Sequence, residues 1–419
     1  MFENIIEKCK SAKAAAPYTA MLSTAQKNKM LETVAAALVA NAEKILAANA
    51  ADAELAKDKP KGFIDRLTLT QKRIEDMAAG VRAVVSLPDP VGIPLEKFTA
   101  KNGLNIEKRS VPLGVVGIIY EARPNVTADC IALCLKSGNC VVLRGSKDAY
   151  NSNLAIVTAV KAALTAGGFE SGFVQLIDDL TREGADFLLK QNKYLDAIIP
   201  RGGAELINNT VQNSTVPVIE TGAGVCHVFV ERTAELKFAE PIVINAKCSR
   251  PSVCNAAETL LIDAGAPKAV FTGLIESLIR NNVQIRACPE TLKIASVYSW
   301  RGKMAAASEQ DFATEYNDFI INVKLVKDTA DAVKHVNRYG THHSDAIITR
   351  DDKAAEFFLN GVDSAAVYVN ASTRFTDGGE FGYGAEMGIS TQKLHARGPV
   401  GLRELTSYKY LVRGAGQVR

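Results

Sequence analysis

Short apolar runs alternate with amphipathic stretches from about residue 111 onward, and this alternation restricts the fold more than any other feature of the sequence. The run GVVGIIY is followed by the helical pattern NVTADCIALCLKSG, and CVVLRG is followed by NLAIVTAVKAALTAGG. FVQLI, AIIP and VPVIE continue the series, and ETLLID, FIINVKLV, DAIIT and SAAVYVN resume it after residue 255. Strands that alternate with helices build a parallel sheet covered on both faces. The sequence therefore predicts two doubly wound, Rossmann-like α/β domains, divided near residues 225–255.

The first hundred residues predict helices instead. Ser23 and Gln26 have the spacing of a capping box, and Thr68 with Gln71 repeats that start signal. Residues 104–113 and 406–414 alternate like strands but fall outside the α/β series. We expect these two segments to form a small β flap that pairs across subunits.

Charge and cysteine usage restrict the partners. The net charge is +3 and Lys and Arg are scattered, so we expect neither nucleic acid nor an anionic membrane as a partner. The chain has no apolar run of about 18 residues to span a bilayer, and its start, MFENIIEKCKSAK, has no signal-peptide core. The eight cysteines show no CxxC pair, which is typical of reduced thiols in a cytoplasmic protein.

Two loops after predicted strands are candidates for phosphate binding. The chain has no GxGxxG after a strand, which argues against an ordinary Rossmann dehydrogenase. Ligands nevertheless bind at the carboxyl ends of parallel strands, where glycine-rich backbone favours phosphate. The residues at these two places are Arg144, Gly145, Ser146 and Lys147, and Arg201, Gly202 and Gly203. Ordinary turns use the same residue types, so both interpretations stay open.

Polar residues follow two further strands. YEARPNVT carries Glu121, Arg123 and Asn125, and the Asn125 amide suits an oxyanion, although a helix cap explains the motif equally well. Glu220 ends VPVIE and is either a site carboxylate or a capping group. Cys226 and His227 are neighbours and point to opposite faces of a strand, so they form no dyad by themselves. No histidine spacing indicates a metal site.

A long polar, glycine-rich segment at 369–399 is more typical of function than of a connecting loop. Together with YEARPNVT, VVLRG, PRGG, VPVIETGAGVCHVFV and RPSVCNAAETLL it resembles the aldehyde dehydrogenase superfamily. NRYGTHHSDAIIT, SYKYLVRG and the block at 362–399 narrow the resemblance to members that reduce the acyl phosphate of glutamate. The resemblance runs in order from about residue 110 to the end.

The resemblance implies roles for individual residues. Cys254 corresponds to the nucleophile, Asn125 to the oxyanion asparagine, and Glu220 to the superfamily glutamate 34 residues earlier. Thr-Gly-Ala-Gly follows Glu220 in place of the usual Leu-Gly-Gly-Lys, so a general base and a positioning group stay open as its roles. Cys248 replaces a small polar residue and is expected to be a bystander. NADP(H) would be held by the two loops and Glu315. The glutamyl group needs a carboxylate clamp and an amine acceptor, and by their chemistry the candidates are Glu121, Arg123, Arg374 and Asp377.

The same resemblance implies NADPH-dependent reduction of L-glutamyl 5-phosphate through a Cys254 thioester, as the second step of proline biosynthesis. It implies an NADP-binding domain at 1–100 and 114–225, a catalytic domain at 226–390, and oligomerisation strands at 101–113 and 391–419. A homodimer or homotetramer is expected, with a transient contact to the kinase that makes the acyl phosphate.

Three alternatives are weighed against this interpretation. An acylating or hydrolytic aldehyde dehydrogenase fits the block at 362–399 less well. A non-catalytic scaffold would not need Cys254, Asn125 and Gly202 together. A thiol hydrolase would need a histidine partner that no motif supplies.

Overall fold

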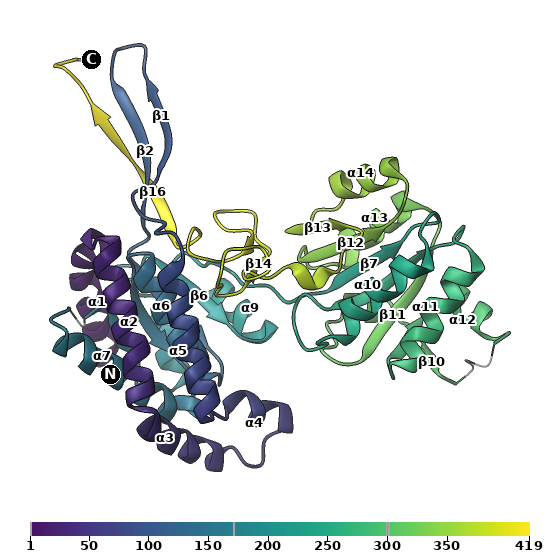
Figure 1. The fold of residues 1–419 in the computed structure, drawn as a ribbon, viewed down its shortest axis with the longest axis horizontal. Helices are drawn as coiled ribbons and strands as arrows, with labels where there is room; N and C mark the ends of the chain where they lie inside the picture. The colour runs from purple at the N-terminus through teal and green to yellow at the C-terminus, as the bar shows by residue number, and fades with distance from the viewer. Residues whose placement is uncertain (1, 171, 299, 301) are drawn as a thin grey trace. The chain divides into compact units, whose positions relative to one another are not determined.

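The computed structural model describes residues 2–170, 172–298, 300 and 302–419, and it divides into two compact units. Unit 1 comprises Met1–Thr221, Gly382–Gly388 and Val400–Arg419 (Figure 1). Unit 2 comprises Gly222–Phe381 and Ile389–Pro399. The boundary predicted at residue 225 therefore lies at Thr221, and residues 400–419 belong with the N-terminal part of the chain.

Unit 1 is built on a four-stranded parallel sheet in the order β5-β4-β3-β6. Its strands are β3 (Val115–Tyr120), β4 (Cys140–Arg144), β5 (Val174–Leu176) and β6 (Ala197–Arg201). Its helices are α1 (Glu3–Met21), α2 (Thr24–Ala40), α3 (Ala42–Leu55), α4 (Lys61–Leu67), α5 (Gln71–Ser86), α6 (Pro124–Lys136), α7 (Tyr150–Ala166), α8 (Arg182–Leu188) and α9 (Ala204–Asn213). All six residues of β3 are buried, as expected for a central strand with helices on both faces.

One of the two predicted helix starts is confirmed. Ser23 and Gln26 form the predicted capping box at α2, with side-chain to backbone bonds in both directions. The second start was predicted at Thr68, which is wrong. Thr70 caps α5 by accepting from the Arg73 N–H at 3.2 Å, whereas the Thr68 hydroxyl donates back to the last turn of α4.

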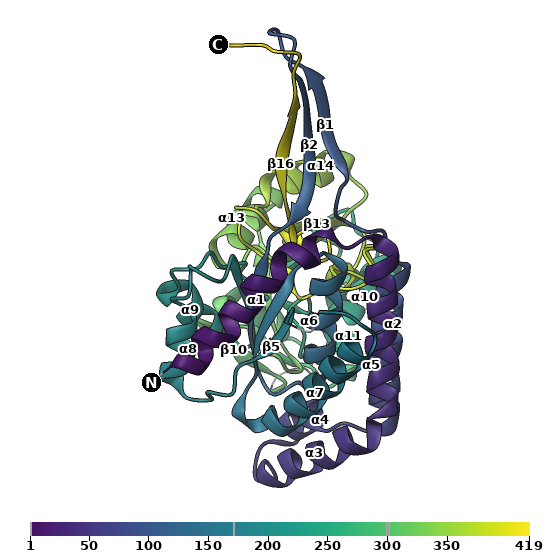
Figure 2. The same ribbon diagram turned by 90° about the vertical axis from the view of Figure 1, so that its left-hand side faces the viewer.

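A three-stranded antiparallel sheet, which we call the flap, projects from unit 1 in both views (Figures 1 and 2). It contains β1 (Pro94–Thr99), β2 (Asn105–Pro112) and β16 (Thr406–Arg413), in the order β1-β2-β16. The two predicted strands are present, and β16 pairs with β2 along its full length. The third strand, β1, was not predicted and lies in the range assigned to the nucleotide-binding domain; all of its residues are exposed.

Unit 2 contains a seven-stranded parallel sheet in the order β10-β9-β11-β8-β7-β12-β13. Its strands are β7 (Cys226–Val230), β8 (Ala257–Asp263), β9 (Gln284–Ala287), β10 (Met304–Ala306), β11 (Ile320–Val326), β12 (Ser344–Ile348) and β13 (Ala366–Val369). Its helices are α10 (Leu236–Cys248), α11 (Lys268–Arg280), α12 (Pro289–Ala295), α13 (Thr329–Tyr339) and α14 (Asp352–Gly361). A short ladder, β14 (Ile389–Ser390) with β15 (Gly398–Pro399), completes the unit.

The unit 2 sheet separates two hydrophobic cores. Val228 and Val230 of β7 pack into the core under α10 and α11, while Phe229 packs into the core under α13 and α14. Successive strand residues therefore face opposite sides, which is the period of two expected of a strand. Both predicted α/β sheets are confirmed.

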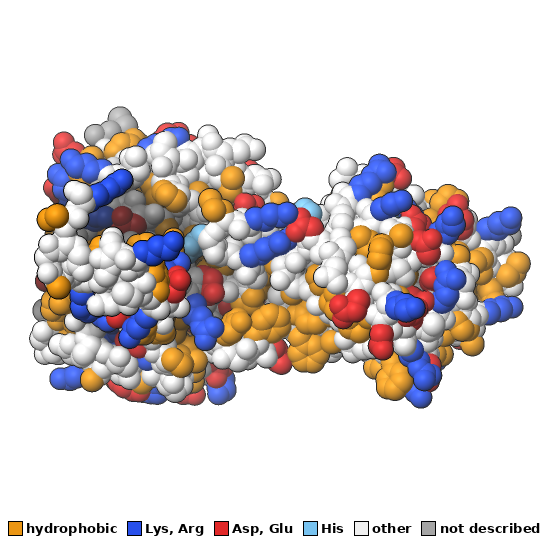
Figure 3. All heavy atoms as spheres, turned by 90° about the horizontal axis from the view of Figure 1, so that it is seen from above, with side chains coloured by type: hydrophobic (Ala, Val, Ile, Leu, Met, Phe, Trp, Pro, Cys, Tyr) orange, Lys and Arg blue, Asp and Glu red, His pale blue; other side chains and the backbone are white. Residues whose placement is uncertain are grey.

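VPVIE was predicted to be a strand but makes a single bridge, Val218 with Ile198, since Pro217 has no N–H to extend a ladder. Within the described residues no single helix is long and apolar enough to cross a membrane, although α2 and α3 meet that test together across a 66° bend. On the face shown in Figure 3, Lys and Arg side chains are mixed with Asp and Glu side chains.

Candidate active site

Three neighbouring strands of unit 1 end in polar residues at one edge of the sheet. Glu121 follows β3, Arg144 ends β4 and Arg201 ends β6. The Glu121 N–H donates to the Arg201 carbonyl at 3.1 Å, and the Glu121 carboxylate accepts from the Gly203 N–H at 2.7 Å. The structure thus brings Glu121, predicted to bind substrate, onto the Arg201–Gly203 loop and gives its carboxylate a role in holding that loop.

Glycines let two side chains pack closely against the backbone at this edge of the sheet. A Cβ on Gly202 would lie 2.7 Å from the Glu121 carboxylate, and a Cβ on Gly145 would lie 2.3 Å from the Asn153 amide nitrogen. Ser146 caps the single turn Lys147–Ala149 by accepting from the Asp148 N–H at 3.2 Å. The side chains of Glu121 and Asn153 therefore occupy the space that a Cβ at Gly202 or Gly145 would need.

Arg144 is fixed at the same edge. Its guanidinium donates to the carbonyls of Leu180 at 3.0 Å and Thr181 at 2.9 Å. Its Nε is buried and has no hydrogen-bond partner among the described residues, and burial lowers the pKa of the group. A guanidinium at the carboxyl end of a parallel strand is of the chemical type that binds a phosphate group. The residues present fit the cofactor that the sequence predicts.

Asn125 occupies the first turn of α6, directly after Pro124. Its amide donates to the Asp129 carboxylate one turn later at 3.4 Å, and burial raises the pKa of Asp129 to about 6. The exposed amide is thereby oriented by a carboxylate on its own helix. Glu220, the predicted third catalytic residue, lies just after the Val218 bridge, also in unit 1.

Cys254 lies in unit 2, in the turn between α10 and β8, and is partly buried. A Cβ on Gly224 would lie 1.4 Å from the Cys254 carbonyl oxygen and 2.3 Å from the carbonyl carbon, so only glycine fits there. The Cys226 thiol donates to the same oxygen at 3.2 Å, and burial raises the pKa of Cys226 well above its usual range. A neutral thiol and a glycine therefore fix the backbone of Cys254.

Glu315 supports this arrangement from another segment. It was predicted to bind the nicotinamide ribose, and its carboxylate accepts from the Gly224 N–H at 2.8 Å. The structure thus joins Glu315 to the loop that packs on Cys254. Sequence analysis noted the small residues after Glu220 but did not predict this contact, because 91 residues separate the two partners.

Asn255 anchors the other side of the nucleophile. Its amide donates to the carbonyls of Thr376 at 3.0 Å and Arg374 at 3.3 Å, and its own carbonyl accepts from the Thr373 hydroxyl at 2.7 Å. The Arg374 guanidinium in turn donates to the Asn255 side-chain oxygen and to Ser249 Oγ. The glycine-rich segment singled out in the sequence thus holds the Cys254 turn.

Asp377, predicted to bind substrate, uses one carboxylate oxygen to accept from the backbone N–H groups of Gly379 and Glu380. Cys248 ends α10, and burial raises its pKa. Among the described residues, no group of three or more His, Cys, Asp or Glu side chains could hold a metal ion, and no disulfide is formed.

A buried ion pair lies next to the Cys254 turn. Lys247 Nζ and the Glu258 carboxylate are 2.7 Å apart, and both side chains are 0% exposed. Burial raises the pKa of Glu258 to about 7, while Lys247 opposes that shift. The pair joins the end of α10 to β8, the two elements between which Cys254 lies.

Comparisons with known proteins show which proteins the chain resembles. The profile described as the aldehyde dehydrogenase family matches residues 2–290. Curated proteins named gamma-glutamyl phosphate reductase from Heliobacterium modesticaldum and Carboxydothermus hydrogenoformans are each 52% identical to the chain and cover all of it, along their own full length. The crystal structure of gamma-glutamyl phosphate reductase from Thermotoga maritima has a TM-score of 0.95 at 44% identity and covers 99% of each chain. An acetylating aldehyde dehydrogenase from Geobacillus thermoglucosidasius, at 16% identity and a TM-score of 0.70, shares the fold.

Proposed function

Because the chain belongs to the aldehyde dehydrogenase family, we propose that it reduces L-glutamyl 5-phosphate to L-glutamate 5-semialdehyde and phosphate with NADPH, the second step from glutamate to proline. The names of the full-length relatives support the substrate, and their identity of 52% supports carrying it over. The observation that carries the proposal is the turn of Cys254, whose backbone is fixed by Gly224, Cys226 and Asn255.

A turn with a fixed backbone holds the Cys254 thiol in one position, as attack on a single acyl carbon requires. A thiol has a pKa near 8.5 in water, and the thiolate is the reactive form. Attack by the Cys254 thiolate on the acyl carbon forms a carbon–sulfur bond. Collapse then breaks the bond to the phosphate oxygen, which leaves with its electron pair. The product on the enzyme is a thioester.

The two other residues predicted to be catalytic, Asn125 and Glu220, belong to unit 1. We assign the Asn125 amide to the oxygen that becomes negative during attack, where loss of one donor costs about 10²- to 10³-fold in rate. Asp129 would keep that amide in one orientation. Glu220 has no water to activate in this reaction, since phosphate replaces water as the acyl partner, and it acts as a positioning group.

NADP(H) would be held by Arg144 to Lys147, by Arg201 to Gly203 and by Glu315, and when bound it supplies the hydride for the thioester. The preference for NADP over NAD is assigned to Arg144 and Lys147, because a 2′-phosphate is bound by cationic side chains. Exchanging both for neutral residues would raise the KM for NADP while leaving that for NAD nearly unchanged.

The reverse reaction tests the proposal. L-Glutamate 5-semialdehyde is supplied, phosphate is varied, and NADPH is followed by its absorbance. NADPH formation that depends on phosphate supports a phosphorylating reductase. Formation without phosphate would contradict the proposal and indicate a hydrolytic aldehyde dehydrogenase, with Glu220 as its general base.

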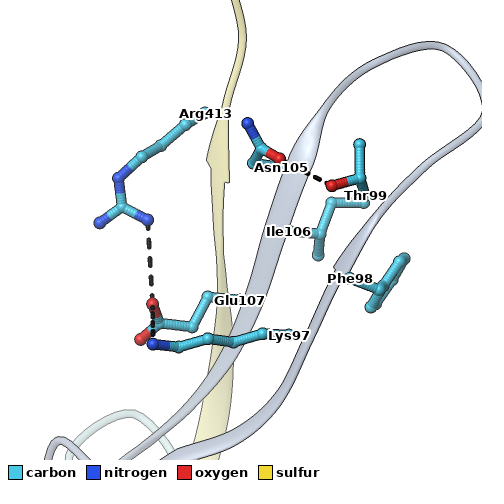
Figure 4. A pocket seen from close by; sticks show the side chains of 7 residues that line it. All are labelled: Lys97, Phe98, Thr99, Asn105, Ile106, Glu107 and Arg413. Atoms are coloured by element: carbon cyan, nitrogen blue, oxygen red, sulfur yellow. Dashed lines mark hydrogen bonds and ion pairs between the residues drawn. The ribbon is translucent and has the colours of Figure 1, made fainter.

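We also propose that the flap pairs between subunits of a homo-oligomer. Its exposed strands carry Phe98, Tyr408, Tyr410 and Val412, each at least 44% exposed. Within the flap Lys97 and Arg413 lie 3.7 and 3.9 Å from the Glu107 carboxylate (Figure 4). Replacing Tyr410 by Lys should lower the mass measured by light scattering, and an unchanged mass would place the interface elsewhere.

A further inference from the structure

Arg374 is a cation held rigidly against the Cys254 turn. Its Nε donates to Ser249 Oγ at 3.1 Å, and a terminal nitrogen donates to the Asn255 side-chain oxygen. These partners stand on the two sides of Cys254 in the sequence, so the guanidinium spans the turn. All of these residues belong to unit 2.

A second cation stands beside the first. Arg250 is exposed and makes no hydrogen bond or ion pair within the described residues. Burial lowers the pKa of Arg374, Arg250 lowers it further, and Asp377, Cys254 and Glu380 oppose that change. Arg250 directly follows Ser249, whose hydroxyl accepts from the partly buried Arg374 guanidinium, so the chain brings the two like charges to the same side of the Cys254 turn. Of the two acids, Asp377 already accepts two backbone N–H groups.

Two like charges beside a nucleophile are unfavourable unless an anion joins them. Guanidinium groups bind phosphate through paired N–H donors, and a pair of them suits a dianion. We propose that Arg250 and Arg374 form the site for the phosphate group of the acyl phosphate, and for inorganic phosphate in the reverse reaction. This inference rests on the proposed function, and it leaves Arg123 for the carboxylate of the glutamyl group.

The site would act when the carbon–oxygen bond breaks. The electron pair of that bond moves onto the departing phosphate oxygen, which takes a proton from solvent. The arginines neutralise the charge that develops there, so they lower the barrier of this step as well as binding the ligand.

Phosphate protection of Cys254 tests the site without turnover. Alkylation of Cys254 by iodoacetamide is followed by peptide mass spectrometry at increasing inorganic phosphate, with ionic strength held constant by NaCl. Phosphate should slow the wild-type reaction, and Arg250→Ala and Arg374→Ala should each need about tenfold more phosphate for the same protection. Arg250→Ala leaves the turn's hydrogen bonds intact, so it answers the question even if Arg374→Ala unfolds.

The same variants are then measured in the reverse reaction. The KM for phosphate should rise about tenfold in each, while the KM for the aldehyde changes less than about twofold. Arg280→Ala, on α11 and 68% exposed, is the matched control and should leave both values unchanged. A phosphate-dependent wild type with unchanged KM in Arg250→Ala would overturn the site and leave the proposed function standing. A wild type without phosphate-dependent turnover would refute the function, and the protection assay would still decide the site.

Discussion

Gly224→Ala is the substitution that most directly tests how the nucleophile is held. The new Cβ would lie 1.4 Å from the carbonyl oxygen of Cys254, 2.3 Å from its carbonyl carbon and 2.8 Å from its Cα. Every one of these is a backbone atom, so no side chain can rotate away. Restoring even a tight contact requires a backbone movement of roughly 1.5 Å in one loop or the other.

The expected cost falls mainly on the chemistry. Overpacking of this kind typically costs about 1–3 kcal/mol of stability, which a chain with two large cores tolerates. A displacement of about 1 Å at the reacting atom costs about 100-fold in rate. We therefore expect kcat of the reverse reaction to fall about 100-fold, with a slower alkylation of Cys254 and only a modest drop in melting temperature.

Gly62→Ala is the matched control. Its Cβ would meet nothing closer than Arg66 Nη1 at 3.8 Å, so activity and alkylation should match wild type. If Gly224→Ala kept kcat within about twofold of wild type, the backbone of Cys254 would not be set by this contact and the reasoning would fail.

The remaining predictions concern other substitutions in unit 2. Cys254→Ser should abolish reduction, while the circular dichroism spectrum and NADPH binding stay unchanged. Cys248→Thr should leave kcat nearly unaltered, and an equal loss of activity in both variants would contradict the assignment of the nucleophile. Lys247→Met should lower the free energy of unfolding by about 3 kcal/mol, because it leaves the buried Glu258 carboxylate without its cation. Denaturant titrations measure this change, and an unchanged midpoint would show that the ion pair contributes nothing to stability. Lys and Arg partners lower the pKa of Asp363 from 3.8 to about 2, so its anchoring of residues 389–399 is complete above pH 3.8 and is lost as the pH falls through 2. Asp363→Asn should accordingly speed hydrogen exchange in residues 389–399 at neutral pH, and equal exchange in both proteins would argue against the anchor.

Much of the fold could be predicted because buried strands and amphipathic helices leave periodic patterns. Most strands of the α/β series were predicted, since runs such as ETLLID become wholly buried strands, whereas the short strands β9 and β10 were not predicted. Strand β1 was missed because its six residues are all exposed and carry no alternation of buried and open positions. Thr68 was chosen over Thr70 because both are threonines before the same helix, and only the hydrogen bond to Arg73 distinguishes them.

The candidate site was predicted residue by residue but not as an arrangement. Motifs identified Cys254, Glu315 and Arg374 separately. Their contacts join segments 91 and 119 residues apart, and no local pattern encodes such distances. Gly224 looked like one small residue among several, and its role became visible only in the close approach to the Cys254 carbonyl.

The return of the C-terminal segments to unit 1 has a consequence for synthesis on the ribosome. Domains usually fold in the order in which they emerge, but unit 1 needs residues 382–388 and 400–419, and its strand β16 is translated after every element of unit 2. Unit 2 likewise lacks the anchors of Cys254 until residues 373–376 have left the exit tunnel. Unit 1 is therefore completed after unit 2, although it begins first, and until β16 has been translated one edge of β2 stays unpaired and open to chaperones and proteases.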